Sequence, residues 1–161
     1  HKRGWDDKWE EYSNWAENGI NYQNKLLELV DEDTNAFNKI IDAYRMPKDN
    51  DESKNKRTEA IQEATKYAIT VPFKIMETSY KSMSVIKKMA EIGNPNSITD
   101  AAVGALCART SVLGAFLNVR INCKDCDDQK FVNTIINQGN EIVKKTNQLE
   151  KEILEITNSK I

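Results

Sequence analysis

The sequence is short of the residues that build disulfide-linked or metal-bound domains. Its 161 residues include one histidine, three cysteines, three prolines and six glycines. A structural zinc site needs about four ligands, and the only histidine is His1 at the start of the chain. A chain of this length can bury roughly 70% of the surface that its unfolded form exposes. We therefore expect one domain, residues 1–161, with no metal.

The sequence also lacks a run of about eighteen apolar residues, which a membrane-spanning helix requires. Its first residues have no apolar stretch of the kind found in secretory signals. The net charge is only −2, and the charged residues, 30% of the total, are of mixed sign. Such a balance gives no general attraction for phosphate backbones or anionic lipid. We expect a cytoplasmic protein that binds neither nucleic acid nor membrane.

Two of the three cysteines, Cys123 and Cys126, form a C-x-x-C pattern, and Cys107 stands apart. This pattern is typical of a redox pair or of half a zinc site. No strand-rich, thioredoxin-like sequence surrounds it, so our interpretation is that these are small thiols near a helix end.

The period of the apolar residues predicts an all-α fold. Apolar residues recur three and four positions apart, and no stretch alternates with the period of two that strands show. Pro47 ends one such stretch, Ser53 or Asp51 can cap the next, and Pro72 should kink or divide it. The strongest break is Gly93-Asn94-Pro95-Asn96-Ser97, after which Ser97 or Thr99 can cap a helix. We predict an antiparallel helical bundle with helices near residues 5–30, 54–92, 101–121 and 129–161, and residues 33–44 either continue the first helix or begin another.

The stretch from Ala101 to Ile121 is the most apolar part of the chain and the richest in small residues. A helix that is apolar nearly all round is usually central, and small side chains let neighbouring helices approach closely. We interpret this stretch as the central helix of the bundle or as an oligomer seam.

Longer motifs carry a family resemblance. The sequence G-N-P-N-S-I-T-D-A-A-V-G-A-L-C-A-R, followed by L-G-A-F-L-N-V-R-I-N, resembles the formiminotetrahydrofolate cyclodeaminases and the related methenyltetrahydrofolate cyclohydrolases. The upstream stretches L-V-D-E-D-T-N-A-F, Y-R-M-P-K and R-T-E-A-I-Q-E-A-T-K-Y-A-I-T-V-P follow in the order expected of that family. The resemblance extends from Gly4 to about Phe131. One feature departs from it, because members usually begin with a further helix carrying a P-G-G-G-S-like segment. The resemblance thus implies a domain truncated at its N-terminus.

The resemblance implies a folate one-carbon enzyme domain. One reaction of the family expels ammonia from a formimino group, which closes the folate to its methenyl form. The other adds water to the methenyl bridge. Both pass through a tetrahedral carbon flanked by nitrogens and need a proton donor and acceptor. The folate is the substrate, and no cofactor is implied. The alternative is a non-catalytic helical scaffold or oligomerisation module, which the missing glycine-rich segment favours.

Asp31 and Asp33 are our candidate catalytic carboxylates. If a helix boundary near them is irregular, both can face one cleft, whereas in a regular helix they would diverge by about 200°. Asp33 can instead cap a helix over the amides of Asn35 and Ala36. We interpret Asp33 as the cap and Asp31 as the chemical candidate.

The candidate substrate-binding residues are cations and polar groups. Arg45 and Lys48 can pair with the glutamate carboxylates of folate, or they can complement the dipole at a helix end. Arg120 must reach a partner, a ligand or solvent from an apolar helix. Polar groups on the turn at residues 93–97 and beyond it can contact a pterin edge, although Asn, Pro and Ser at such a position usually serve only to form the turn. These residues are Asn94, Asn96, Ser97, Asp100 and Asn118, the last four positions from Asn122.

The expected partners follow from the resemblance and from the small-residue helix. We expect a homodimer, with folate bound between helices or across the subunit seam. The domain is also expected to be fused to a formiminotransferase domain or to associate with one. A coiled-coil adaptor is disfavoured, because Pro47, Pro72 and Pro95 interrupt any long heptad pattern.

Overall fold

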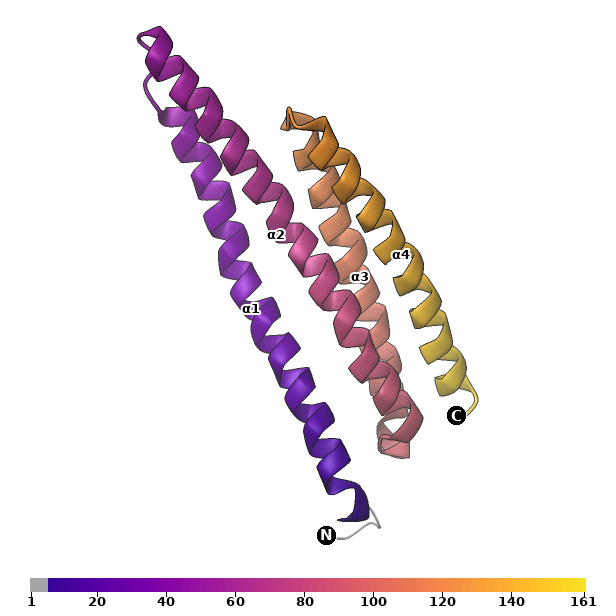
Figure 1. Ribbon diagram of the computed structural model, residues 1–161. Coiled ribbons are helices and arrows are strands. Elements are labelled where there is room, and N and C mark those ends of the chain that lie inside the picture. Colours follow the sequence, from indigo (N-terminus) through magenta and orange to yellow (C-terminus); the bar gives the residue numbers. More distant parts are fainter. Residues whose placement is uncertain (1–5) are drawn as a thin grey trace.

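The protein is a bundle of four long helices (Figure 1). The computed structural model describes residues 6–161, so the predicted start of the first helix near Trp5, and His1, lie outside the described residues. Three-residue 3-10 helices precede α1, α3 and α4, and no strand occurs among residues 6–161. The all-α, antiparallel prediction is confirmed. The four helices are α1 (Trp9–Arg45), α2 (Asp51–Ile92), α3 (Ile98–Asn122) and α4 (Gln129–Asn158).

Helix α1 runs without interruption for 37 residues. Residues 33–44 therefore continue the first helix and do not begin another, and the interpretation of Asp33 as a cap is wrong. Neither glycine nor proline occurs between Gly19 and Pro47, and the Thr34 hydroxyl donates to the Val30 carbonyl, 3.3 Å away, within the helix. The short polar side chains near Asp33 lie along a continuous helix instead of ending one.

The turn between α1 and α2 is fixed at both sides. Asn50, and not the predicted Ser53 or Asp51, is the N-cap of α2. The Asn50 side chain accepts the backbone N–H of Ser53 at 2.8 Å, and the Ser53 hydroxyl accepts the N–H of Asn50 at 3.1 Å. Arg57 donates two hydrogen bonds to the Tyr44 carbonyl, at 3.3 and 3.2 Å, near the end of α1. These contacts join the end of one helix to the start of the next.

Pro72 lies inside α2 without dividing it. Proline has no N–H, so the carbonyl of Ala68, four residues earlier, loses its helical partner. The side-chain amide of Asn122, at the end of α3, donates to that carbonyl at 2.7 Å. Of the two predicted effects, division of the helix at Pro72 does not occur, and Asn122 supplies the hydrogen bond that the proline removes.

Helix α2, and not α3, is the element that every other helix packs against. Helices α3 and α4 also pack on each other, whereas the main contact of α1 is with α2. Figure 1 shows α2 running between α1 and the pair α3 and α4. Gly139 of α4 lies directly against the ring of Phe116 on α3, where a Cβ would collide with it. The fully buried side chains of α2, such as Met76 and Met83, form the centre of the bundle.

Helix α3 is apolar on both of its faces, but only one face is buried. The segment Pro95–Asp125 is long and apolar enough to cross a membrane by length and composition, a property that the central helix of a bundle shares. Its inner residues pack between α2 and α4. The outer residues Val103, Leu106, Leu117 and Ile121 are 44–63% exposed. Helix α3 is therefore central on its inner face, and its exposed outer face leaves the alternative of an oligomer seam as a prediction.

The contact between Asn122 and Ala68 can be tested by a double-mutant cycle. Asn122→Ala should lower the free energy of unfolding by about 1–3 kcal/mol, because it leaves a buried carbonyl without a donor. In a Pro72→Ala background the new N–H at residue 72 can satisfy Ala68, so the same substitution should cost less. Urea denaturation of the four proteins measures the coupling. Equal costs in both backgrounds would show that Asn122 does not compensate for the proline.

Asp128 links α4 to α2 through a charge pair. Its carboxylate accepts from Lys66 at 2.7 Å and from the backbone N–H of Phe131 at 3.0 Å. The lysine first, and then the Phe131 amide, lower the pKa of Asp128, and the same hydrogen bond raises the pKa of Lys66. A lowered folded-state pKa gives stability above the ordinary carboxyl pKa of about 3.9, which is lost as pH falls through the lowered value.

Asp128→Asn should therefore lower Tm at pH 7 and have progressively less effect as the pH falls below about 4. Asparagine keeps the capping geometry, so the difference reports the charge. Thermal unfolding followed by circular dichroism between pH 7 and pH 2 measures it. Asp127→Asn, at an exposed neighbour, is the control and should change Tm little at either pH. A constant Asp128→Asn deficit at all pH values would contradict the ion-pair account.

Candidate functional site

The turn between α2 and α3 holds its polar side chains in fixed positions. The Asn94 side chain accepts the N–H of Asn96 at 3.1 Å, and the Ser97 N–H donates to the Asn94 carbonyl at 2.9 Å. Ser97 occupies the N-cap position of α3 but makes no capping hydrogen bond with its side chain, contrary to the prediction. The predicted break at residues 93–97 is confirmed, and the Ser97 hydroxyl is not used by the helix end.

A pocket of about 330 Å³ opens beside this turn, between α2 and α3. Its volume is at the lower end of the range for small-molecule sites. At Gly104 an added Cβ would sit 3.6 Å from Ile86, so the missing side chain widens the pocket. Three predicted residues, Asn94, Ser97 and Asp100, lie on the pocket wall. The remaining lining is apolar or backbone: Val85, Ile86, Met89, Gly93, Ala101 and Gly104.

Sequence reasoning found the polar side of this pocket but missed its apolar wall. Ile86 and Met89 belong to the apolar stripe of α2 and Gly104 to the small residues of α3, a pattern that by itself indicates packing between helices. The available signal was position, because all three lie within about three helical turns of the break at residues 93–97. Asn96 is exposed and does not line the pocket.

Asp31 and Asp33 lie elsewhere. Both are exposed on a continuous α1, so they point to different sides of the helix rather than into one cleft. Their neighbour Glu32 pairs with Lys74 at 3.1 Å. The hydrogen bond between Ser79 and Ser111 sets the register of α2 and α3. By that register the two carboxylates lie about 16 residues, roughly 24 Å, along the bundle from Asp100.

The predicted cations are also remote from the pocket. Arg45 ends α1 and is 3.9 Å from Asp42, with both side chains highly exposed. Lys48 is exposed in the following turn. Tyr12 donates to the Ile92 carbonyl at the pocket end of the bundle. Arg45 is 33 residues further along α1, roughly 50 Å away. The structure therefore does not bring Arg45 or Lys48 to the pocket within one chain.

Asn118 and Arg120 lie near the far end of α3 and are exposed. Arg120 forms no ion pair with any of the residues that the structure describes, so it reaches solvent. Asn122 joins α3 to α2, because its side-chain amide donates to the Ala68 carbonyl. These residues do not join the group formed by Asn94, Ser97 and Asp100.

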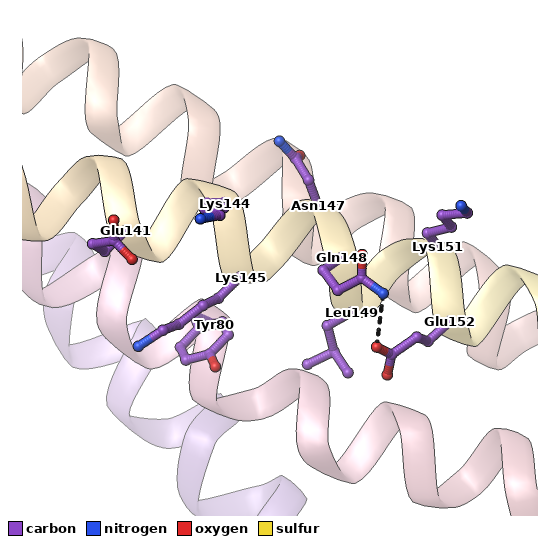
Figure 2. A pocket seen from close by; sticks show the side chains of 9 residues that line it. All are labelled: Tyr80, Glu141, Lys144, Lys145, Asn147, Gln148, Leu149, Lys151 and Glu152. Atoms are coloured by element: carbon purple, nitrogen blue, oxygen red, sulfur yellow. Dashed lines mark hydrogen bonds between the residues drawn. The ribbon is translucent and has the colours of Figure 1, made fainter.

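A larger hollow, of about 730 Å³, lies along α4 (Figure 2). Figure 2 shows that Asn147 and Lys151 point away from Tyr80 and Leu149, so its side chains do not converge on one point. Its carboxylate Glu152 is already paired with Lys87 at 2.7 Å, which lowers the pKa of Glu152. None of the predicted residues lines this hollow, and we prefer the smaller pocket beside the turn as the candidate site.

The cysteine pair lies inside the bundle. Cys123 and Cys126 are both buried and free, and burial first, then the neighbouring Cys126 thiol, raise the pKa of Cys123. A raised pKa keeps a thiol protonated and unreactive. Within residues 6–161, no group of three or more histidine, cysteine or carboxylate side chains is placed to hold a metal ion.

The fold is a helical bundle, with a partly apolar pocket beside the turn between α2 and α3 as the candidate site. A sequence model of the formiminotransferase-cyclodeaminase family matches residues 1–141. The chain belongs to this family.

Individual relatives agree with this assignment. The chain is 37% identical to formimidoyltransferase-cyclodeaminase of Rattus norvegicus over 107 residues, which are 66% of this chain and 20% of that protein. It is 33% identical to methenyltetrahydrofolate cyclohydrolase of Methylorubrum extorquens over 136 residues, 84% of this chain and 65% of that protein. The chain thus spans about a fifth of the first relative and under two thirds of the second.

A solved structure has the same fold. The formiminotetrahydrofolate cyclodeaminase from Thermotoga maritima superposes with a TM-score of 0.84 and 23% sequence identity. The match covers 98% of this chain and 75% of that one. All three predicted pocket residues lie inside the part of the chain that the family model matches.

Proposed function

We propose that this domain acts on folate one-carbon units and deaminates formiminotetrahydrofolate to methenyltetrahydrofolate, with release of ammonia. The observation that carries the proposal is the meeting of an amide, a hydroxyl and a carboxylate in one partly apolar pocket within the family-matched region. The names of the relatives combine this activity with a formiminotransferase. By that analogy the domain works beside a formiminotransferase domain, fused or separate.

The pocket suits a flat, polar-edged ring such as a pterin. Ile86 and Met89 offer an apolar surface for the ring face, and the missing side chain of Gly104 leaves room for it. The Asn94 amide and the Ser97 hydroxyl supply donors and acceptors for the ring edge. This division between apolar wall and convergent polar groups is typical of small-molecule sites.

Asp100 is the carboxylate that we assign to proton transfer. In the deamination, the formimino group reacts in its protonated, cationic form, and the second folate nitrogen attacks its carbon to form a carbon bonded to three nitrogens. Asp100 accepts the proton that the attacking nitrogen loses, then returns it to the departing nitrogen, which leaves as ammonia. The lone pair of a ring nitrogen then completes the methenyl bridge. Proton number and charge balance without a cofactor, so tetrahydrofolate enters only as the carrier of the substrate group.

Hydrolysis of the methenyl bridge is the second candidate, because the chain spans 65% of a cyclohydrolase and only about 20% of the fused cyclodeaminase. Here water attacks the methenyl carbon and Asp100 takes its proton, which leaves a tetrahedral carbon bonded to two nitrogens and a hydroxyl. One carbon–nitrogen bond then breaks as the hydroxyl proton moves to the departing nitrogen, which leaves a formyl group, and Asp100 releases its proton to solvent. The same carbon of the substrate and the same carboxylate take part in both reactions. The products distinguish them, because only deamination releases ammonia.

The test follows methenyl absorbance with formiminotetrahydrofolate and, separately, with methenyltetrahydrofolate as substrate. It uses this chain and a form that carries the glycine-rich helix usual in the family. Asp100→Asn should lower kcat by about 100-fold or more, as expected for loss of a general acid–base. Asp127→Asn is the control with unchanged rate. Full activity of Asp100→Asn with loss in Asp31→Asn would move the chemistry to α1, and no turnover in either form would leave a scaffold.

We further propose that two copies associate through α3. Its outer residues Val103, Leu106, Leu117 and Ile121 are exposed, and a Cβ at Gly114 would meet nothing within 4 Å. Between Ala101 and Asn122 the only charged residues are Arg109 and Arg120, and Arg109 is held by Glu150 at 3.1 Å. A two-fold interface places the same surface against itself, which this nearly uncharged strip tolerates.

Leu117→Asp should convert the dimer to a monomer, because it places two carboxylates in the apolar seam. Sedimentation velocity measures the mass, and circular dichroism checks that the helices remain. Leu27→Asp, an equally exposed change on α1, is the matched control and should leave the dimer intact. A monomer with Leu27→Asp but not with Leu117→Asp would place the interface on α1 instead.

A further inference from the structure

A second apolar stripe, on α1, is left uncovered by the bundle. We define the α1 stripe as Ile20, Leu27, Val30, Phe37 and Tyr44, whose side chains are 54–63% exposed. They follow one another at intervals of seven, three, seven and seven residues. This is the spacing by which a helix presents a continuous seam to a second helix. The stripe is about 24 residues, or roughly 36 Å, long.

The α1 stripe is separate from the side of α1 that packs on α2. Leu29, Ala36 and Ala43 are buried against α2. Val30, Phe37 and Tyr44 each come one residue later, which places them about 100° further around the helix. Helix α1 thus has two apolar seams, and among residues 6–161 its main partner helix is α2.

Carboxylates border the α1 stripe. Glu17, Asp31 and Asp33 lie beside it, and within residues 6–161 none of the three forms an ion pair. Two more acidic residues, Glu28 and Asp42, lie on its outer edge. Lys25 pairs with Glu28 at 2.9 Å and Arg45 lies 3.9 Å from Asp42, so these two edge carboxylates are partly balanced, whereas Lys39 lies 4.4 Å from the centre of the Tyr67 ring.

This charge pattern decides which kind of partner fits. In a two-fold pairing with another copy, the acidic borders would face each other, and like charges at such positions are destabilising. A helix with cations at the positions beside its own apolar seam would meet the carboxylates instead. The exposed outer residues of α3 have no acidic residues beside them between Ala101 and Asn122. We therefore expect the α3 surface and the α1 stripe to bind different partners.

We propose that the α1 stripe is a docking site for a separate amphipathic helix with an apolar face and basic borders. Val30 and Phe37 contact the apolar face of that helix, and Asp31 and Asp33 pair with its lysines or arginines. The proposal assigns a binding role to the two carboxylates that the structure places far from Asp100. It does not depend on the proposed enzymatic activity, because no folate is involved.

The experiment measures binding of two designed helical peptides of about 25 residues by fluorescence anisotropy. Both carry leucines at heptad positions, and one has lysines and the other glutamates beside them. The lysine peptide should bind at least tenfold more tightly than the glutamate peptide at low salt, and the difference should shrink as salt screens the charges. Phe37→Asp should weaken the lysine peptide at least tenfold, whereas Leu117→Asp on α3 should leave it unchanged.

A further variant tests the acidic residues beside the α1 stripe. Replacing Glu17, Asp31 and Asp33 by their amides should reduce the preference for the lysine peptide and leave the helices intact by circular dichroism. Equal binding of the two peptides, or no binding of either, would overturn the proposal. So would loss of the site in the form that carries the family's glycine-rich helix, since that helix would then be the occupant, or a dimer that Leu27→Asp dissociates.

Discussion

The arrangement depends on one hydrogen bond between the Asn122 side chain and the Ala68 carbonyl. Helix α2 is the support for the other three helices, and Pro72 leaves a gap in its hydrogen bonds near its middle. A buried carbonyl without a donor would favour breaking the helix there. Because Asn122 donates at 2.7 Å, α2 stays continuous, and the end of α3 is placed at a fixed height along it. That height sets where α3 begins, and hence where the pocket lies.

The positions of most helices could be predicted from apolar period and from the three prolines. The predicted break at residues 93–97 agrees with the structure, because its glycine, asparagines and proline act locally. The continuity of α1 through Asp33 could not be predicted in this way. Aspartate, threonine and asparagine can begin a helix or occur inside one. Residues 33–44 continue α1 because the helix packs along α2 for most of its length.

The candidate site was predictable in part for the same reason. Asn94, Ser97 and Asp100 are close in sequence, so a single turn brings them together. The apolar wall comes from α2 and could be recognised only after the α2–α3 register was known. Each residue along a helix adds 1.5 Å, so Asp31 and Arg45 lie far along the bundle from the turn between α2 and α3. Sequence patterns do not give these separations, because they depend on which helix lies beside which.

The tie between Arg57 and the end of α1 bears on how the chain folds. The contacts that hold α1 involve residues up to Ile92 and few beyond, and the capped turn at Asn50 and the two bonds from Arg57 to Tyr44 close the hairpin locally. Pairings close in sequence form faster than distant ones, because less chain entropy is lost before they are made. During synthesis on a ribosome, α1 and α2 can therefore assemble while α3 and α4 are still being made, and the later helices add to a preformed hairpin.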